Sequence, residues 1–394
     1  MPRKSTYIKQ SKLKNENLMI VDAGDLFFES EEVKPIMQPA VRLKAETIIK
    51  MYNEIGCDAL NIGERDLILG LDFLRELEKK AHFTFISANL TDTKNENLFS
   101  PYIVKKVGGI KVGVFGIIGD EAEVLSKVKK YTKGAVIVKD AILSAKSVVE
   151  ELREKVDLIV ALTHHRVGRD WVLARRVSGI DLIIGGHDKQ KLSKPYHVDN
   201  TLITHGGEKG QYLGHIECTL MPGQSMKKDF KIDLIPLNDK IPYDKDSYRL
   251  IIAYQDQLAK SYGANKVKNT APKELRRVSC SKCHPEVYEA WKKTKHAKAY
   301  KTLVDRNRHF DPECLPCHTT RFGEPGGFNI ESHDEELANV QCESCHGSGT
   351  EHIAKDGGVP LKRFDKSVCL KCHTKERSSD FEKDYEEYLA RGTH

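Results

Sequence analysis

The sequence predicts a layered α/β domain at the N-terminus, followed by a smaller, mostly α-helical domain. Three observations lead to this prediction. The chain has 394 residues, which is long for a single hydrophobic core. As far as residue 236, short apolar runs alternate with amphipathic helical segments, a pattern typical of α/β layers. Beyond residue 274 this pattern gives way to four copies of one cysteine and histidine motif.

The elements of the α/β domain, residues 1–238, are expected from hydrophobic periodicity. Short apolar runs predict buried strands, and apolar residues at helical spacing predict helices. The expected strands cover residues 18–21, 58–62, 83–88, 110–118, 157–163, 181–184, 202–204 and 214–220. The expected helices cover residues 40–55, 64–80, 141–155 and 170–177. We therefore expect helices to cover a largely buried sheet.

A connector, residues 239–273, joins the two predicted domains. Leu250, Ile251, Tyr254 and Leu258 recur at helical spacing, which predicts an amphipathic helix over residues 244–262. The following ten residues read as a polar linker.

The C-terminal domain, residues 274–394, carries the C-x-x-C-H motif four times. Two thiols at this spacing can form thioethers to porphyrin vinyl groups, and the adjacent imidazole can bind the iron as the proximal ligand. A redox dithiol or a zinc site would explain a C-x-x-C pair, but neither needs a histidine after every second cysteine. The motifs therefore predict four covalently attached haem c groups. The copies are Cys280-Ser281-Lys282-Cys283-His284, Cys314-Leu315-Pro316-Cys317-His318, Cys342-Glu343-Ser344-Cys345-His346 and Cys369-Leu370-Lys371-Cys372-His373.

Four haems in so short a segment would themselves form most of the core of this domain. Each iron then needs a sixth ligand or keeps an open face. The remaining histidines of the domain are the candidate distal ligands: His296, His309, His333, His352 and His394.

Several stretches of this domain resemble the tetrahaem cytochrome c family that accepts electrons from hydroxylamine oxidoreductase. The similarity extends over roughly residues 278–394, and it includes Cys283-His284-Pro285, His296-Ala297, Cys317-His318-Thr319-Thr320, Glu351-His352 and the closing His394. The resemblance implies that His296, His352 and His394 are distal ligands of three haems. It also implies that the second haem, bound by His318, is five-coordinate.

Polar side chains follow four of the strands expected in the α/β domain. Asp25 follows the first, Asn61 and Asp66 flank the turn after the second, and His164-His165 and His187-Asp188 follow two later strands. Open α/β sheets place their sites at these strand ends. Mixed oxygen and nitrogen donors suit Mn, Fe or Zn, and two-metal centres of this kind hydrolyse phosphoesters.

The same region resembles the metallophosphoesterase domain of 5′-nucleotidases. The matching stretches are Asp22-Ala23-Gly24-Asp25-Leu26-Phe27, Ser87-Ala88-Asn89-Leu90, Gly109-Ile110-Lys111-Val112-Gly113, Leu162-Thr163-His164 and Ile183-Ile184-Gly185-Gly186-His187-Asp188. The resemblance implies that Asp25 bridges two metal ions and that His164 and His187 are ligands.

The sequence departs from this family at three places. The Asp-x-His pair of the family's first strand is not in this chain. The family's Gly-Asn-His-Glu-x-Asp turn reads here Asn61-Ile62-Gly63-Glu64-Arg65-Asp66, so the catalytic histidine is missing, and Asn61 is a ligand only in a shifted register. Lys189 stands where a second histidine or glutamine donor is usual. The expected metal ligands are thus Asp25, Asn61, His164 and His187, and no catalytic residue is assigned.

Composition argues against a nucleic-acid-binding protein and against a membrane-spanning one. A net charge of +6 gives no nucleic-acid footprint, and no apolar run reaches the ~18 residues of a membrane span. Haem c is attached outside the cytoplasm, so we expect a periplasmic or exported protein. Such a protein needs a signal peptide, but residues 1–16 are basic and polar and do not have the apolar segment of one. Either the signal peptide was removed, or this reading frame begins inside the true gene.

We expect electron transfer through the haems, with redox proteins as partners, to be the main activity. The first alternative is a metal-dependent hydrolase of a phosphoester such as a nucleotide, or of a thiosulfo-ester, with an attached electron carrier. The second alternative is a redox enzyme that acts on a nitrogen oxide at a five-coordinate haem. Whether the α/β domain is an enzyme stays open at this stage.

Overall fold

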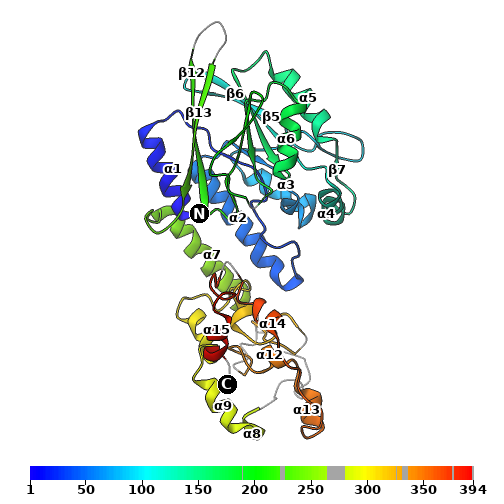
Figure 1. The fold of residues 1–394 in the computed structure, drawn as a ribbon, viewed down its shortest axis with the longest axis vertical. Coiled ribbons are helices and arrows are strands. Elements are labelled where there is room, and N and C mark those ends of the chain that lie inside the picture. The colour runs from blue at the N-terminus through cyan, green and yellow to red at the C-terminus, as the bar shows by residue number, and fades with distance from the viewer. Residues whose placement is uncertain are drawn as a thin grey trace. The chain divides into compact units, whose positions relative to one another are not determined.

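The computed structural model describes residues 1–188, 190–221, 227–263, 280–324, 326–330, 336–374 and 377–392. The chain forms two compact units (Figure 1). The N-terminal unit comprises Met1–Val33 and Lys44–Ile251, and the C-terminal unit comprises Lys34–Leu43 and Ile252–His394. The C-terminal unit therefore consists of a long segment that begins within the predicted connector helix and a separate segment of ten residues from the N-terminal third of the chain.

The N-terminal unit contains two parallel-type sheets and a long hairpin. The strands of the larger sheet have the order β10-β11-β9-β8-β6-β5, with β5 and β10 antiparallel to their neighbours at the two edges. A three-stranded parallel sheet has the order β1-β2-β3, and β12 pairs with β13 in the hairpin. The strands are β1 Val21–Asp22, β2 Ala59–Asn61, β3 Thr84–Ile86, β4 Leu90–Thr91, β5 Tyr102–Val107, β6 Ile110–Ile118, β7 Ile137–Val138, β8 Leu158–His164, β9 Leu182–Gly185, β10 Tyr196–Val198, β11 Thr201–His205, β12 Tyr212–Met221 and β13 Lys227–Pro236.

Both faces of the larger sheet are covered, which explains why its central strands are continuously apolar. One face packs on helices α5 and α6 through a cluster that includes Ala145, Leu152 and Leu173. The other face packs on a cluster that includes Ile216 of β12 and Ile232 of β13. All seven residues of β8 are buried as a result. The helices are α1 Pro2–Lys14, η1 Pro35–Met37, α2 Gln38–Ile55, η2 Arg65–Leu67, α3 Gly70–Lys80, α4 Ala122–Thr132, α5 Ala141–Leu152, α6 Val167–Arg176 and α7 Lys245–Gly263.

Most of the predicted elements are present. The strand predicted over residues 110–118 is confirmed as β6, and the connector helix is confirmed as α7. The single helix predicted over residues 64–80 is wrong, because η2 ends at Leu67 and α3 begins only at Gly70, whose φ of +86° does not continue a helix from the preceding residues. Helix α1 was not predicted, because it is rich in basic residues and Ile8 is the only large apolar side chain among its buried residues, so the sequence shows no apolar periodicity.

The C-terminal unit is built from short helices. They are α8 Cys280–Cys283, α9 Pro285–Lys292, η4 His296–Lys298, α10 Ala299–Val304, α11 Leu315–His318, α12 Glu343–His346, α13 Thr350–Ala354, α14 Lys366–Leu370 and α15 Tyr385–Gly392. Its largest apolar cluster surrounds Cys314 and Leu315 of the second motif. Ala40 at the start of α2 and Leu258 of α7 complete this cluster, so the C-terminal unit uses residues that precede the haem motifs in the sequence.

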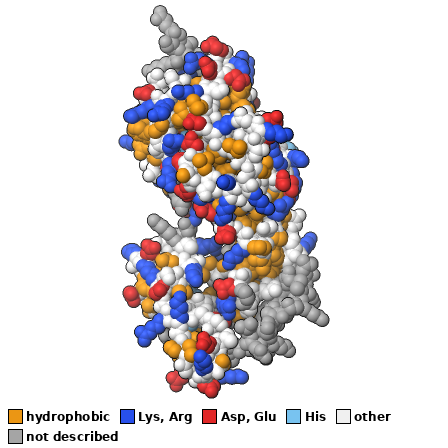
Figure 2. Space-filling model, turned by 90° about the vertical axis from the view of Figure 1, so that its right-hand side faces the viewer, with side chains coloured by type: hydrophobic (Ala, Val, Ile, Leu, Met, Phe, Trp, Pro, Cys, Tyr) orange, Lys and Arg blue, Asp and Glu red, His pale blue; other side chains and the backbone are white. Residues whose placement is uncertain are grey.

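The surface carries no single extended field of charge on the face that Figure 2 shows, where acidic and basic side chains are interspersed. Within the described part of the chain, no helix combines the length and the apolar character that a bilayer crossing requires.

Candidate functional site

The loop after β1 places Asp25 at the carboxyl end of the smaller sheet. Gly24 and Asp25 both have positive φ, +100° and +56°, so the chain turns sharply there. The buried Asp66 carboxylate fixes this turn, because it accepts hydrogen bonds from the backbone N–H groups of Asp25 at 2.8 Å, Leu26 at 2.8 Å and Phe27 at 3.2 Å. Burial, followed by the neighbouring Asp25 charge, raises the pKa of Asp66 to about 7.

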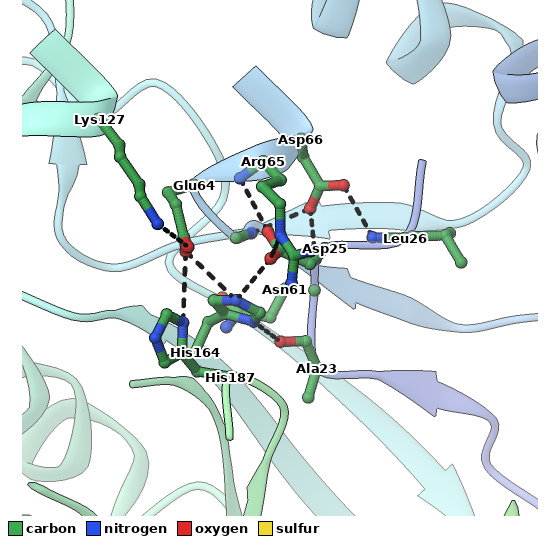
Figure 3. A network of polar contacts seen from close by, with 12 residues as sticks. Ala23, Asp25, Leu26, Asn61, Glu64, Arg65, Asp66, Lys127, His164 and His187 are labelled. Carbon is green, nitrogen blue, oxygen red and sulfur yellow. Dashed lines mark hydrogen bonds and ion pairs between the residues drawn. The ribbon is translucent and has the colours of Figure 1, made fainter. Parts of the chain in front are cut away.

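Two buried side chains, Glu64 and His164, and the half-buried His187 converge near this loop (Figure 3). Glu64 follows β2, His164 ends β8 and His187 follows β9. Glu64 Oε2 lies 3.3 Å from His164 Nε2 and 3.5 Å from His187 Nδ1, and the three atoms all lie within 4.8 Å of one another. None of these atoms has a hydrogen-bond partner among the described residues. A carboxylate and two imidazoles left in this state fit one ion of Mn, Fe or Zn.

The tautomer of His164 also fits a metal ligand. Its Nδ1 lies 2.9 Å from the carbonyl oxygen of Ala23, which can only accept, so Nδ1 carries the hydrogen and Nε2 is the atom that faces Glu64. Burial by itself would lower the pKa of His164, but the Asp25 and Glu64 carboxylates hold this pKa well above its ordinary value. The proton that the raised pKa retains is the one on Nε2, and a cation bound at Nε2 would displace it.

Asp25 is engaged by Arg65 as well as by His164. Arg65 donates its backbone N–H to Asp25 Oδ1 at 2.8 Å and its Nε–H to Oδ2 at 2.5 Å, while His164 Nε2 lies 3.2 Å from Oδ2. The side chain of Asp25 is only 5% exposed. Both oxygens of the carboxylate are therefore engaged, Oδ1 by a backbone N–H group and Oδ2 by the two cationic side chains.

The structure brings together three of the four side chains expected as metal ligands: Asp25, His164 and His187. Asn61 is directed at β6 instead, where its Nδ2 donates to the carbonyl oxygen of Ile117 at 3.0 Å. Glu64 stands in the group in its place. Glu64 was not predicted as a ligand because its position reads as the start of a helix, although it follows the second strand closely. Lys189 lies outside the described residues.

Gly63, at the position of the family's catalytic histidine, has no room for a side chain. A Cβ at this residue would lie 2.3 Å from Asp25 Oδ1 and 2.7 Å from the Asp25 nitrogen. A histidine could therefore not replace Gly63 unless the loop that carries Asp25 moved.

A second buried group lies beside His164. The Asp170 carboxylate is within 2.7 Å of His165 Nε2, of His205 Nε2 and of the Thr163 hydroxyl that donates to it. All four side chains are buried. Burial would raise the pKa of Asp170, but the two imidazoles hold it below its ordinary value. This group ties the end of β8 to β11, and so it fixes the strand end that carries His164.

In the C-terminal unit, each haem motif has a compact, turn-like backbone. The histidine N–H donates to the carbonyl of the first cysteine at 2.8 Å for His284, 2.9 Å for His346 and 2.9 Å for His373. Residues i, i+3 and i+4 share one face of such a turn. The C-x-x-C-H spacing therefore presents both thiols and the imidazole to the same side, as a covalently held haem requires.

Two of the predicted proximal histidines face predicted distal ones. The ring centres of His284 and His352 are 6.2 Å apart, and those of His373 and His296 are 6.1 Å apart. Two imidazoles that bind one iron from opposite faces would have ring centres roughly 6 Å apart, since a metal–imidazole bond is about 2 Å long. Both pairs are thus spaced as haem ligands would be.

The orientations of these imidazoles fit the same role. In four of the histidines, Nδ1 lies within hydrogen-bond distance of a backbone carbonyl oxygen. The pairs are His296 with Gly392 at 3.0 Å, His352 with Val359 at 2.7 Å, His318 with Ala299 at 2.7 Å and His346 with Lys362 at 3.2 Å. A carbonyl oxygen only accepts, so Nδ1 carries the hydrogen in each ring and Nε2 keeps its lone pair for a metal.

The first and third motifs line one cavity of about 460 Å³, which Cys280, His284, Cys342 and His346 share with Tyr288 and Phe364. The predicted distal ligand His394 lies outside the described residues, as does His333. Among the described residues no histidine ring stands opposite His318 at the separation found for the other two pairs.

Known proteins resemble the two regions separately. Residues 279–347 match the family model described as cytochrome c554 and c-prime. Cytochrome c-554 of Nitrosomonas europaea is 39% identical in an alignment 88 residues long, which covers 18% of this chain and 37% of that protein. The trifunctional nucleotide phosphoesterase protein YfkN of Bacillus subtilis is 26% identical in an alignment 296 residues long, which covers 65% of this chain and 20% of that protein.

Among solved structures, the sulfate thiohydrolase SoxB of Thermus thermophilus has a similar fold, with a TM-score of 0.58 at 20% identity over 73% of this chain and 54% of that one. The N-terminal region thus has homologues among 5′-nucleotidases and calcineurin-like phosphoesterases and has a metallophosphoesterase fold. The C-terminal region is cytochrome c554-like. The chain spans less than half the length of the curated relatives it matches.

Proposed function

We propose that this protein is an electron carrier with four covalently bound haem c groups, located in the periplasm or exported. The observation that carries the proposal is the pairing of His284 with His352 and of His373 with His296 at 6.2 and 6.1 Å. The eight motif cysteines would hold the porphyrins, and the motif histidines would bind the irons. A haem with two imidazole ligands has no open position for a substrate, so it serves electron transfer.

The test is a haem count and a redox titration of the mature protein. We expect four haems per chain in the pyridine haemochromogen assay, and reduction in several one-electron steps. A count of two or fewer on protein matured by a cytochrome c assembly system would refute the proposal, because the motifs would then not be haem sites. Location is tested separately, by fractionation of cells that express the natural gene.

A second candidate function, metal-dependent hydrolysis, is favoured by the convergence of Glu64, His164 and His187. A cation bound there would act as a Lewis acid toward a phosphoester, such as a nucleotide, or a thiosulfo-ester. The residues themselves would fix the ion, and Arg65 would supply positive charge beside it. No side chain at Gly63 is available to protonate a leaving group.

This candidate is tested by assaying phosphoester hydrolysis with chelated protein and after Mn²⁺ is returned. Hydrolysis that depends on Mn²⁺ and is lost in His164→Ala would support a hydrolase. Metal binding without turnover on nucleotides, simple phosphomonoesters or thiosulfo-esters would leave the domain as a metal-binding structure and refute hydrolysis of these classes.

A third candidate, chemistry at an open haem, is favoured by the surroundings of His318. Its Nδ1 is anchored on Ala299, and no described histidine faces it at ligand spacing. A haem held there would keep one coordination position for a small molecule such as a nitrogen oxide. Nitric oxide binding to one haem of the reduced protein would support this candidate, and four low-spin haems that ignore nitric oxide would exclude it.

A further inference from the structure

We propose that the N-terminal site binds one divalent cation, on Glu64, His164 and His187, and that the Arg65 guanidinium takes the place of a second cation on Asp25. This inference rests on the metal site proposed above and goes beyond it, because it fixes the number of ions and assigns a role to Arg65. The resemblance to 5′-nucleotidases predicted instead that Asp25 bridges two ions.

The Asp25 carboxylate is already occupied by Arg65. Arg65 reaches one oxygen through its backbone N–H and the other through Nε at 2.5 Å. The arginine is held in this position because its Nη1 also donates to the carbonyl oxygen of Glu29 at 3.2 Å. Figure 3 shows Arg65 and Asp25 facing each other beside the Glu64 group. A cation that used Asp25 as a bridging ligand would have to displace this side chain.

The charge of Arg65 also opposes a second cation at Asp25. A guanidinium does not lose its proton under any condition in which the protein is folded, so Arg65 is a permanent charge. Its side chain is 27% exposed and that of Asp25 is 5% exposed, so little water screens the pair. A second dication on Asp25 would face both the guanidinium and the first ion at short range in a poorly screened site, and the repulsion would be strong.

The carboxylates near Asp25 in the described part of the chain do not form a second ligand group. Glu64 gives Oε2 to the two imidazoles, and its Oε1 lies 3.9 Å from Lys127 Nζ. Asp66 cannot serve, because its oxygens accept backbone N–H groups from the loop after β1 and from Gly63. Of the three carboxylates here, Glu64 thus belongs to a ligand group with two imidazoles, Asp25 is already paired with arginine, and Asp66 is used by the backbone.

The experiment counts non-haem metal on the full-length, haem-loaded protein. Chelated protein is titrated with Mn²⁺ by calorimetry, and bound manganese is counted by elemental analysis, which keeps the haem iron out of the count. We expect one Mn²⁺ per wild-type chain. Glu64→Gln should weaken binding at least tenfold. The control is Glu123→Gln, since Glu123 also pairs with Lys127 at 2.9 Å but is exposed and outside the ligand group, and it should bind as wild type does.

Two substitutions of Arg65 test its role. Arg65→Met removes the charge and frees Asp25, so we expect either a second Mn²⁺ or at least tenfold tighter binding of the first. Arg65→Lys keeps a cation beside Asp25 and should still bind one ion, with far-UV circular dichroism as the check that both variants fold. Two ions on the wild-type chain, or an Arg65→Met variant with unchanged stoichiometry and affinity, would overturn the inference alone. No bound ion on the wild-type chain would overturn the proposed metal site itself.

Discussion

The pairing of histidines in the C-terminal unit makes a quantitative prediction for the variant His352→Gly. If His352 is the distal ligand of the haem on His284, its removal converts that haem from six-coordinate to five-coordinate. A ferric haem with two imidazoles is low-spin, whereas a ferric haem with one imidazole is high-spin. The histidine at 6.2 Å is the only part of the pair that changes.

The expected magnitude follows from counting ligand pairs over the four motifs. With the haem on His318 five-coordinate and the other three paired, about one quarter of the haem is high-spin in the wild type. His352→Gly should raise this fraction to about one half. His296→Gly should do the same at the haem on His373, and the double variant should reach about three quarters, because the two distal histidines serve different irons.

The assay is electron paramagnetic resonance of the oxidised protein, integrated against the haem count. The control is His309→Gly, which removes a histidine of the same unit whose ring contacts Phe310, at 3.9 Å between ring centres. This control should leave the spin state unchanged. An unchanged high-spin fraction in His352→Gly would refute the pairing, and so would a double variant that shows no more high-spin haem than either single variant.

Three further predictions concern stability. Asp170→Asn should lower the free energy of unfolding of the N-terminal unit by about 3 kcal/mol, because buried donors lose a charged acceptor, as measured by denaturant titration followed through Trp171 fluorescence. Gly63→Ala should lower the melting temperature of the same unit and abolish metal binding, since the new methyl group would overlap Asp25 Oδ1; wild-type values for both would contradict the loop packing. Leu315→Ala should destabilise the C-terminal unit by ~2–5 kcal/mol, measured by guanidinium titration of the Soret band, because Leu315 is fully buried in its main apolar cluster.

Much of the candidate metal site could be predicted from sequence, and one part could not. The carboxyl ends of parallel strands meet at the same edge of a sheet, so Asp25, His164 and His187 could be expected near one another from their positions after successive strands. Whether Asn61 or Glu64 joins the two histidines depends on the direction of the side chains at the end of β2 and in the turn that follows it. A shift of one residue along a strand reverses the direction of its side chains, and only the packing of β2 against β6 fixes that direction.

The sequence by itself determined the two kinds of chemistry in this protein. Local spacing places two thiols and an imidazole on one face of a turn, so each haem motif is complete within five consecutive residues. The tertiary structure decided what depends on residues far apart in the chain. It pairs His284 with His352, draws Ala40 and Leu258 into the core around the second motif, and sets Arg65 against Asp25. These contacts arise from packing between distant segments, and no local pattern of residues encodes such packing.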